Sequence, residues 1–119
     1  MSEKVPNAFG CLLKAAGLSR ETASIYLEVS PKTLAQWLWK GVKPPHGVLT
    51  ELNQLIEKTQ QQAELLAEMD TIPVSLTEEQ AQQAGWPGLD TERHCLGMAL
   101  AKRLQANKPL PTFVPAHHE

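Results

Sequence analysis

The sequence predicts an all-α protein: an N-terminal helical bundle, a long linking helix and a C-terminal helical segment. Three observations lead to this fold class. Apolar residues recur at the i, i+3 and i+4 spacing of helix faces through most of the chain. Most of these stretches follow Ser, Thr, Asp or Pro, which favour helix starts, and several end at glycine. We therefore expect a domain over residues 1–58, a helical extension over 59–107 and a proline-rich tail over 108–119.

The first helix is expected over residues 7–16. Gly17 follows it and can adopt the left-handed conformation of a helix stop. The inner face carries apolar side chains at helical spacing: Phe9, Leu12, Leu13 and Ala16. This helix should supply one side of an N-terminal core.

Two short helices joined by a tight turn come next. Ser19 is expected to cap the first of them, which runs from Arg20 to about Leu27. Ser30 caps the second, and Pro31 takes its first helical position, where the missing N–H costs nothing. Two well-capped helices in immediate succession predict a helix-turn-helix.

The second of these helices should end near Lys40, with Gly41 as a left-handed stop. Leu34, Trp37 and Leu38 form its buried stripe at i, i+3 and i+4. The side chains left for its other faces are Lys32, Gln36, Trp39 and Lys40.

A long helix begins at the Pro44-Pro45 pair and is long enough to reach Met69. Its first half should close the N-terminal bundle. Polar residues over 60–64 interrupt the apolar stripe, which leaves two interpretations. Either the helix breaks near Thr59, or its far end packs on a second subunit or on the C-terminal region.

The region after this helix contains a connector and a short helix. Residues 70–75 alternate between apolar and polar but are too few to assign as a strand. Thr77 and Gln80 form a capping box that starts a helix, which stops at Gly85. The indole of Trp86, in the turn that follows, should anchor that turn to a core.

Asp90 is expected to cap a last helix that runs from Thr91 to about Ala106 and ends at Asn107. Leu96, Leu100 and Leu104 form one ridge of it, with Cys95, Met98 and Ala99 beside them. The proline-spaced tail over 108–115 should be extended. It is either disordered or lies across a partner through Leu110, Phe113 and Val114.

The helix pair resembles the helix-turn-helix of the Cro/C1-type (lambda-repressor-like) family over about residues 7–58. Ser24 falls at the small residue where the two helices cross, and Leu27, Val29, Leu34 and Trp37 fall at the family's apolar positions. The loop over 40–45 is similar to the family's Gly/Lys/Pro loop. The resemblance implies a lambda-repressor-like bundle, with Arg20 at a phosphate-contacting position.

One residue departs from the pattern of this family, which usually has glycine in the turn. Glu28 stands there, and a positive φ at a residue other than glycine carries strain. Either the turn is wider in this chain or Glu28 accepts the strain. Its carboxylate would also lie near the expected DNA face.

The order of the parts is weakly similar to that of small dimeric phage and bacterial regulators, including autorepressors of the anti-CRISPR-associated type. This similarity rests on Trp86 and on the apolar face of the last helix. It implies that the C-terminal segment holds a dimer together.

The charge of the chain is unevenly distributed. The net charge is −2, but residues 1–58 carry +2 and residues 59–119 carry −4. The positive half therefore contains the helix-turn-helix. Because phosphate contacts supply most non-specific affinity and the cations are few, a two-fold dimer is the expected DNA-binding form.

Neither a membrane helix nor a secretory signal is expected, because the chain has no long apolar run and no apolar stretch after its first residues. Cys11 and Cys95 are far apart and lack a C-x-x-C partner. We expect both to be small core residues of a reduced, cytoplasmic protein.

A helix inserted in the major groove reads bases from its N-terminal turns, so Ser30, Lys32, Thr33 and Gln36 should face the duplex. Gln36 can pair with adenine and Lys32 can reach guanine. Arg20, Lys40 and Lys43 suit phosphates. Ordinary solvated side chains are the alternative for Gln36 and the lysines. Trp39 is expected to cover the core edge rather than stack on a sugar.

No enzyme motif is present, so we expect no catalytic residues and no cofactor. His94 and Cys95 are adjacent on a helix and point about 100° apart, which argues against a shared metal. The predicted function is a sequence-specific transcriptional regulator, a repressor or autorepressor, that binds double-stranded DNA as a homodimer on an inverted repeat. The alternative is an antitoxin-like or adaptor module that binds a protein partner through its C-terminal half.

Overall fold

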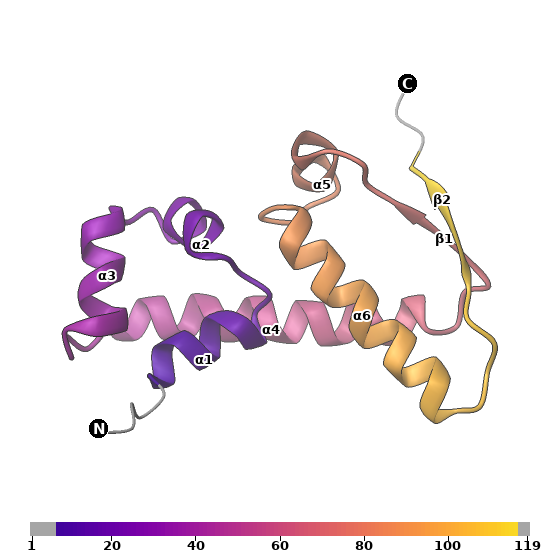
Figure 1. Cartoon of the computed structure of the whole chain (residues 1–119), viewed down its shortest axis with the longest axis horizontal. Helices are drawn as coiled ribbons and strands as arrows, with labels where there is room; N and C mark the ends of the chain where they lie inside the picture. The colour runs from indigo at the N-terminus through magenta and orange to yellow at the C-terminus, as the bar shows by residue number, and fades with distance from the viewer. Residues whose placement is uncertain (1–6, 117–119) are drawn as a thin grey trace, which may run out of the picture. The chain divides into compact units, whose positions relative to one another are not determined.

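The computed structural model describes residues 7–116 and is mostly helical (Figure 1). The elements in chain order are α1 (Ala8–Ala15), α2 (Arg20–Tyr26), α3 (Pro31–Trp39), α4 (His46–Leu66), β1 (Thr71–Val74), α5 (Glu78–Gln83), α6 (Leu89–Gln105) and β2 (Thr112–Pro115). The chain divides into two compact units, one ending at Ile56 and one beginning at Glu57. The prediction of a helical protein is confirmed, but the expectation that it would be purely α-helical is wrong, because β1 and β2 form a small sheet.

In the first unit, α1, α2 and α3 each begin where the sequence places a capping side chain. The side-chain oxygens of Asn7, Ser19 and Ser30 each accept a hydrogen bond from the backbone N–H three residues later. Gly17 and Gly41 have φ values of 73° and 71°, so both act as the expected left-handed stops. Local capping chemistry therefore sets these helix boundaries.

The core of the first unit is apolar and includes an aromatic pair. The rings of Phe9 and Trp37 meet edge to face with centroids 5.5 Å apart. The other buried apolar side chains are Leu13, Ala16, Leu18, Ala23, Leu27, Leu34, Leu38, Leu52 and Leu55. Leu12 was expected on the inner face of α1 but is exposed, because the buried side of this short helix is narrower than the apolar run in its sequence.

The turn between α2 and α3 accepts backbone strain. Glu28 has a φ of 56°, so the turn keeps the geometry for which glycine is suited although the side chain is not glycine. The Ser24 hydroxyl donates a hydrogen bond of 2.5 Å to the Val29 carbonyl and ties α2 to the residues just before α3. Of the two alternatives for this turn, strain at Glu28 is therefore correct.

Helix α4 runs without interruption from His46 to Leu66. Thr59, where a break was one alternative, lies inside the helix and is buried. In the second unit, Ala63 and Ala67 pack in one apolar cluster with Trp86 and with residues of α6. The far end of α4 therefore packs on the C-terminal region, as the other alternative held.

Strands β1 and β2 pair in parallel, with Ile72 opposite Phe113 (Figure 1). The backbone N–H groups of Thr112 and Ala116 donate to the carbonyls of Asp70 and Val74. Because successive backbone N–H groups of a strand point to opposite sides, the N–H positions of residues 113 and 115 face away from β1. Residue 115 is proline. In β1, the backbone nitrogen of Pro73 faces away from β2. Prolines thus remove donors from both outer edges of the sheet, which disfavours pairing with a further strand.

Helix α6 begins at Leu89, two residues earlier than expected, and its N-cap is Gly88 rather than Asp90. Its buried face contains Cys95, Leu96 and Ala99, but it also contains Thr91, Glu92 and Arg103. Leu104, expected on the inner ridge, is 62% exposed. The inner face is rotated toward these polar residues, of which Glu92 and Arg103 find partners in neighbouring segments.

Arg103 is the central polar residue of the second unit. Its guanidinium donates to the carbonyls of Ala67, Met69 and Pro109 at 2.7–3.0 Å and to the Asp70 carboxylate at 3.2 Å. The carbonyls of Ala67 and Met69 follow the C-terminal end of α4, where a cation is favourable. One buried side chain thus joins α4, α6 and the segment that leads to β2.

Glu92 forms a second buried polar contact, with the loop after β1. Its carboxylate accepts hydrogen bonds from the backbone N–H of Ser75 at 2.9 Å and from the Ser75 hydroxyl at 2.6 Å. Within residues 7–116, no buried side-chain nitrogen or oxygen lacks a hydrogen-bond partner. The second unit therefore compensates the polar groups that it buries.

Both cysteines are free thiols. Cys95 is fully buried, as expected, but Cys11 is exposed on α1 and is not a core residue. Leu13, four residues after Phe9, lies on the same buried face of the helix. Cys11, two residues after Phe9, lies on the opposite face and is exposed.

Candidate nucleic-acid interface

The outer face of α3 carries a polar stripe that ends in an aromatic residue. Leu34, Trp37 and Leu38 turn inward and form the buried side of the helix. Lys32, Gln36 and Trp39 follow one another at spacings of four and three residues, so they lie on one face, opposite the buried side. Lys32 and Trp39 are exposed and Gln36 is partly exposed.

Three lysines of this region have no hydrogen-bond or ion-pair partner within the described chain. Among residues 7–116, the side chains of Lys32, Lys40 and Lys43 take part in no hydrogen bond or ion pair, and all three are exposed. Lys40 directly follows α3, and Lys43 lies in the loop before α4. These three positive charges are therefore available to an external anion.

Ser30 and Thr33, at the start of α3, are engaged locally. The Ser30 hydroxyl accepts the Thr33 backbone N–H at 3.1 Å and donates to the Thr33 hydroxyl at 3.0 Å. Both residues remain at least partly exposed. Their first task is thus to cap α3, and the Thr33 hydroxyl keeps its own proton for an outside acceptor.

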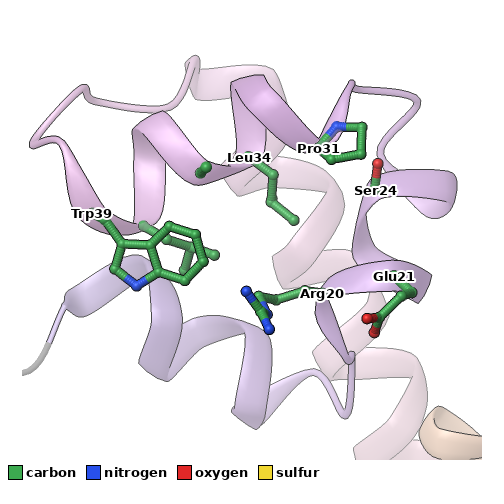
Figure 2. A pocket seen from close by; sticks show the side chains of 8 residues that line it. Arg20, Glu21, Ser24, Pro31, Leu34 and Trp39 are labelled. Atoms are coloured by element: carbon green, nitrogen blue, oxygen red, sulfur yellow. The ribbon is translucent and has the colours of Figure 1, made fainter.

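Arg20 and Trp39 form a cation–π pair that links the start of α2 to the end of α3. The guanidinium carbon lies 5.2 Å from the centre of the indole ring. In Figure 2 the Arg20 side chain extends toward Trp39, and Glu21 lies on the other side of it. Trp39 is 63% exposed, so the expectation that it covers the core edge is wrong.

A pocket of about 190 Å³ lies between α2 and α3 and is bordered by this pair (Figure 2). Its apolar wall is made by Leu34, Ala35 and Leu38. Arg20 and Trp39, which both line the pocket, are exposed. The pocket places an apolar surface directly beside a fixed positive charge.

All seven residues predicted to bind DNA lie in the first unit: Arg20, Ser30, Lys32, Thr33, Gln36, Lys40 and Lys43. The structure places each of them at the start of α2, on α3 or near its ends, and none is buried. Sequence reasoning left Trp39 off the buried stripe but preferred the core edge to a sugar contact for it, and so did not count it among the residues of this surface. Its position seven residues after Lys32, on the same helix face, was the signal that could have found it.

Two other ionisable residues, Glu28 and Tyr26, lie near the outer face of α2 and α3. Glu28 is exposed in the turn between α2 and α3. Tyr26 packs in part against the core, as expected, and burial together with the nearby Glu51 carboxylate raises the pKa of its phenol. Tyr26 therefore stays neutral at physiological pH and adds no charge to this surface.

Cys95, in the second unit, is a titratable group with a strongly shifted pKa. Burial, with a smaller contribution from the Glu92 carboxylate, raises the pKa of the Cys95 thiol to about 11. The thiol is protonated at neutral pH, and its sulfur lies 3.5 Å from the Thr59 carbonyl. A protonated, buried thiol is a poor nucleophile.

Over residues 7–116, no cluster of three or more His, Cys, Asp or Glu side chains is arranged to hold a metal ion. The helices of the same range include none with the length and apolar character needed to cross a membrane. Comparisons of the chain with models of protein families, with curated proteins and with solved structures found no match.

Proposed function

We propose that this protein is a sequence-specific DNA-binding regulator in which α2 and α3 act as a helix-turn-helix of the Cro/C1 type. The observation that carries the proposal is the exposed face of α3. It presents Lys32 and Gln36 in the N-terminal turns, with Lys40 and Lys43 beyond the far end and without partners among residues 7–116. A helix that enters the major groove needs this distribution, with base-reading groups first and phosphate-binding cations around them.

The chemistry of the individual residues supports the same proposal. Gln36 can donate to and accept from adenine in a bidentate pair, and Lys32 can donate to the acceptors of guanine. Arg20 is at the N-terminal end of α2, where the helix dipole also favours a phosphate. The caps at Ser19 and Ser30 set the helix starts from which these side chains project.

A homodimer is part of the proposal, because one subunit offers only a few cations. The second unit exposes large apolar side chains that a partner copy would cover: Leu65, Met69, Leu104, Leu110 and Phe113. The prolines at both edges of the sheet favour side-chain packing over strand pairing as the means of association. Sedimentation velocity of a Leu65→Lys, Leu104→Lys variant should show monomers; a persistent dimer would place the interface elsewhere.

Binding to duplex DNA is the test of the function. The wild-type chain is used to select fragments from a random duplex pool, and the affinity for the selected duplex is measured over a range of salt concentrations. We expect log K to fall steeply with log salt, because each neutralised phosphate contributes a slope of about −0.9. Lys32→Glu should reduce the affinity at least about ten-fold, since it replaces an attraction by a repulsion.

The matched control is Lys102→Glu, the same charge reversal on α6 in the second unit. Lys32 is exposed and Lys102 is partly exposed, and neither side chain forms a hydrogen bond or ion pair within residues 7–116, so both variants should keep the helical circular dichroism of the wild type. A wild-type chain that selects no duplex, or that binds with an affinity insensitive to salt, would contradict the proposed function.

A further inference from the structure

Trp39 occupies an unusual place for a large apolar side chain. It lies on the same face of α3 as Lys32 and Gln36, opposite the buried stripe, and about 10 Å along the helix from Lys32. Nearly two thirds of its surface is exposed, whereas Trp37, two residues earlier, is buried in the core. Core packing therefore does not account for an aromatic residue at this position.

Arg20 contributes the second observation. Its guanidinium lies against the Trp39 indole, and no other residue within 7–116 forms a hydrogen bond or an ion pair with it. The contact joins the guanidinium carbon to the ring at 5.2 Å, and the N–H donors of the guanidinium have no acceptor among residues 7–116. Trp39 thus restricts the orientation of a cation whose hydrogen-bonding groups are still available.

The surroundings of the pair combine apolar surface and positive charge. The pocket between α2 and α3 begins beside Arg20, with Leu34, Ala35 and Leu38 as its wall. A nucleotide backbone has the complementary chemistry, because an anionic phosphate alternates with a deoxyribose that has an apolar face. Lys40, next to Trp39 in the chain, adds a further cation without a partner in the described range.

We infer that Arg20 and Trp39 together form a DNA-backbone clamp: the Arg20 guanidinium, held by the indole, binds one phosphate bidentately, and the exposed indole packs on the adjoining deoxyribose. This inference rests on the proposed DNA-binding function and extends it to a residue outside the base-reading turns. Trp39 acts both as a contact to sugar and as a positioning residue for Arg20. A planar guanidinium suits this role better than an ammonium, because it can stack and bind an oxygen pair at once.

The experiment is a double-mutant cycle on the duplex that the wild-type chain selects. Arg20→Gln, Trp39→Leu and the double variant are compared with the wild type for affinity and for the salt slope. Arg20→Gln should reduce the slope by about 0.9, one phosphate contact. Trp39→Leu should weaken binding about five-fold when Arg20 is present. In the chain that already carries Arg20→Gln, it should weaken binding by less than about two-fold, because the cation it positions is then missing.

Conservative variants separate positioning from general packing. Trp39→Phe keeps an aromatic face and should recover most of the affinity lost in Trp39→Leu. Arg20→Lys keeps the charge but loses the planar fork, so it should bind more weakly than the wild type at equal salt slope. Leu76→Ala and Lys102→Gln, at an exposed leucine and a lysine of the second unit, control for lost surface area and lost charge.

The outcomes distinguish the clamp from the function on which it rests. If the wild type selects no duplex, the proposed function itself fails. If the wild type binds but Trp39→Leu weakens binding equally with and without Arg20→Gln, or not at all, the clamp is wrong and the function stands. Loss of affinity in Trp39→Leu together with a lower melting temperature than Leu76→Ala would also overturn it, since the residue would then be structural.

Discussion

Both units of the protein contain a cation–π pair, and the two pairs are used in opposite ways. In the second unit, the Lys58 ammonium lies 5.0 Å from the centre of the Trp86 ring and donates to the Gly85 carbonyl at 2.6 Å. Trp86 is only 9% exposed. In the first unit, the Arg20 guanidinium carbon lies 5.2 Å from the centre of an exposed indole, and its N–H donors have no hydrogen-bond partner among residues 7–116. The same interaction therefore closes a turn in one unit and presents a cation in the other.

The contrast extends to the other charged residues of the two units. Arg103 and Glu92 are buried in the second unit with hydrogen-bonded partners, and Lys108 pairs with Glu68 at 3.0 Å. Lys32, Lys40 and Lys43 in the first unit have no such partners in the described range. Charged side chains that stabilise a fold are paired within the protein, whereas those that bind a ligand must stay exposed. By this criterion the second unit is structural and the first is the proposed binding unit.

The largest expected effect tests the two tryptophans directly. Trp86→Ala should destabilise the second unit by about 4 kcal/mol, because it removes a large side chain from an apolar cluster. Trp39→Ala should change the free energy of unfolding by less than about 0.5 kcal/mol, since its side chain is mainly in water. Urea denaturation followed by circular dichroism measures both. Equal losses would remove the distinction between the two pairs.

The next effect concerns the buried arginine. Arg103→Ala should cost about 3 kcal/mol, because the carbonyls of Ala67, Met69 and Pro109 lose their donor. Amide hydrogen exchange should show the loss in residues 57–116 and leave the first unit protected. Lys102→Ala, at a partly exposed lysine of the same helix whose side chain forms no hydrogen bond or ion pair within residues 7–116, is the control. A uniform loss of protection in both units would show that the units do not unfold separately.

A smaller effect comes from the Cys95 thiol in alkaline solution. Because its folded pKa of about 11 lies above the ordinary value of 9.0, the unfolded chain loses this proton first as the pH rises. The stabilisation that the protonated thiol contributes is fully present below pH 9 and is lost as the pH rises toward 11. About 1 kcal/mol of it has been lost at pH 10. Denaturation of wild type and Cys95→Ala at pH 7 and pH 10 should differ in their pH dependence by this amount. An identical pH dependence would mean that the thiol titrates normally.

The smallest expected effect lies in the first unit, at the strained turn. Glu28→Gly should raise the free energy of unfolding by about 0.5 kcal/mol, the release of left-handed strain minus the greater chain entropy of glycine. It should also strengthen DNA binding, because a carboxylate leaves the proposed interface. Glu28→Ala is the control, since it removes the charge and keeps the strain. If Glu28→Gly melts no higher than Glu28→Ala, the positive φ is not a source of strain.

Local rules were sufficient for most boundaries in the first unit. The starts of α2 and α3 are determined by Ser19, Ser30 and Pro31. The ends of α1 and α3 are determined by Gly17 and Gly41. Each of these acts through backbone groups within three or four residues, so no distant partner is needed. For the same reason the sequence could place most of the candidate residues on two consecutive helices and their caps, whereas their part in DNA binding stays a prediction.

Prediction failed where the deciding partner is distant in the chain. The 70–75 segment was assigned as a connector because four residues with a proline give little strand signal, and its partner begins about forty residues later. Leu104 looked apolar enough for the inner ridge, yet Arg103 takes the inward position because three carbonyls converge on it. Trp39 was expected at the core edge because the sequence of α3 does not show how far its covered face extends beyond the buried stripe.

The sequence by itself determined the helical character, the caps and stops of α2 and α3, and the set of polar residues available on their surfaces, since each depends on neighbours along the chain. Only the tertiary structure decided that β1 pairs with β2, that Arg103 is buried and that Trp39 is exposed against Arg20. These depend on which faces meet after folding, and burial is a property of the assembled chain rather than of a residue type.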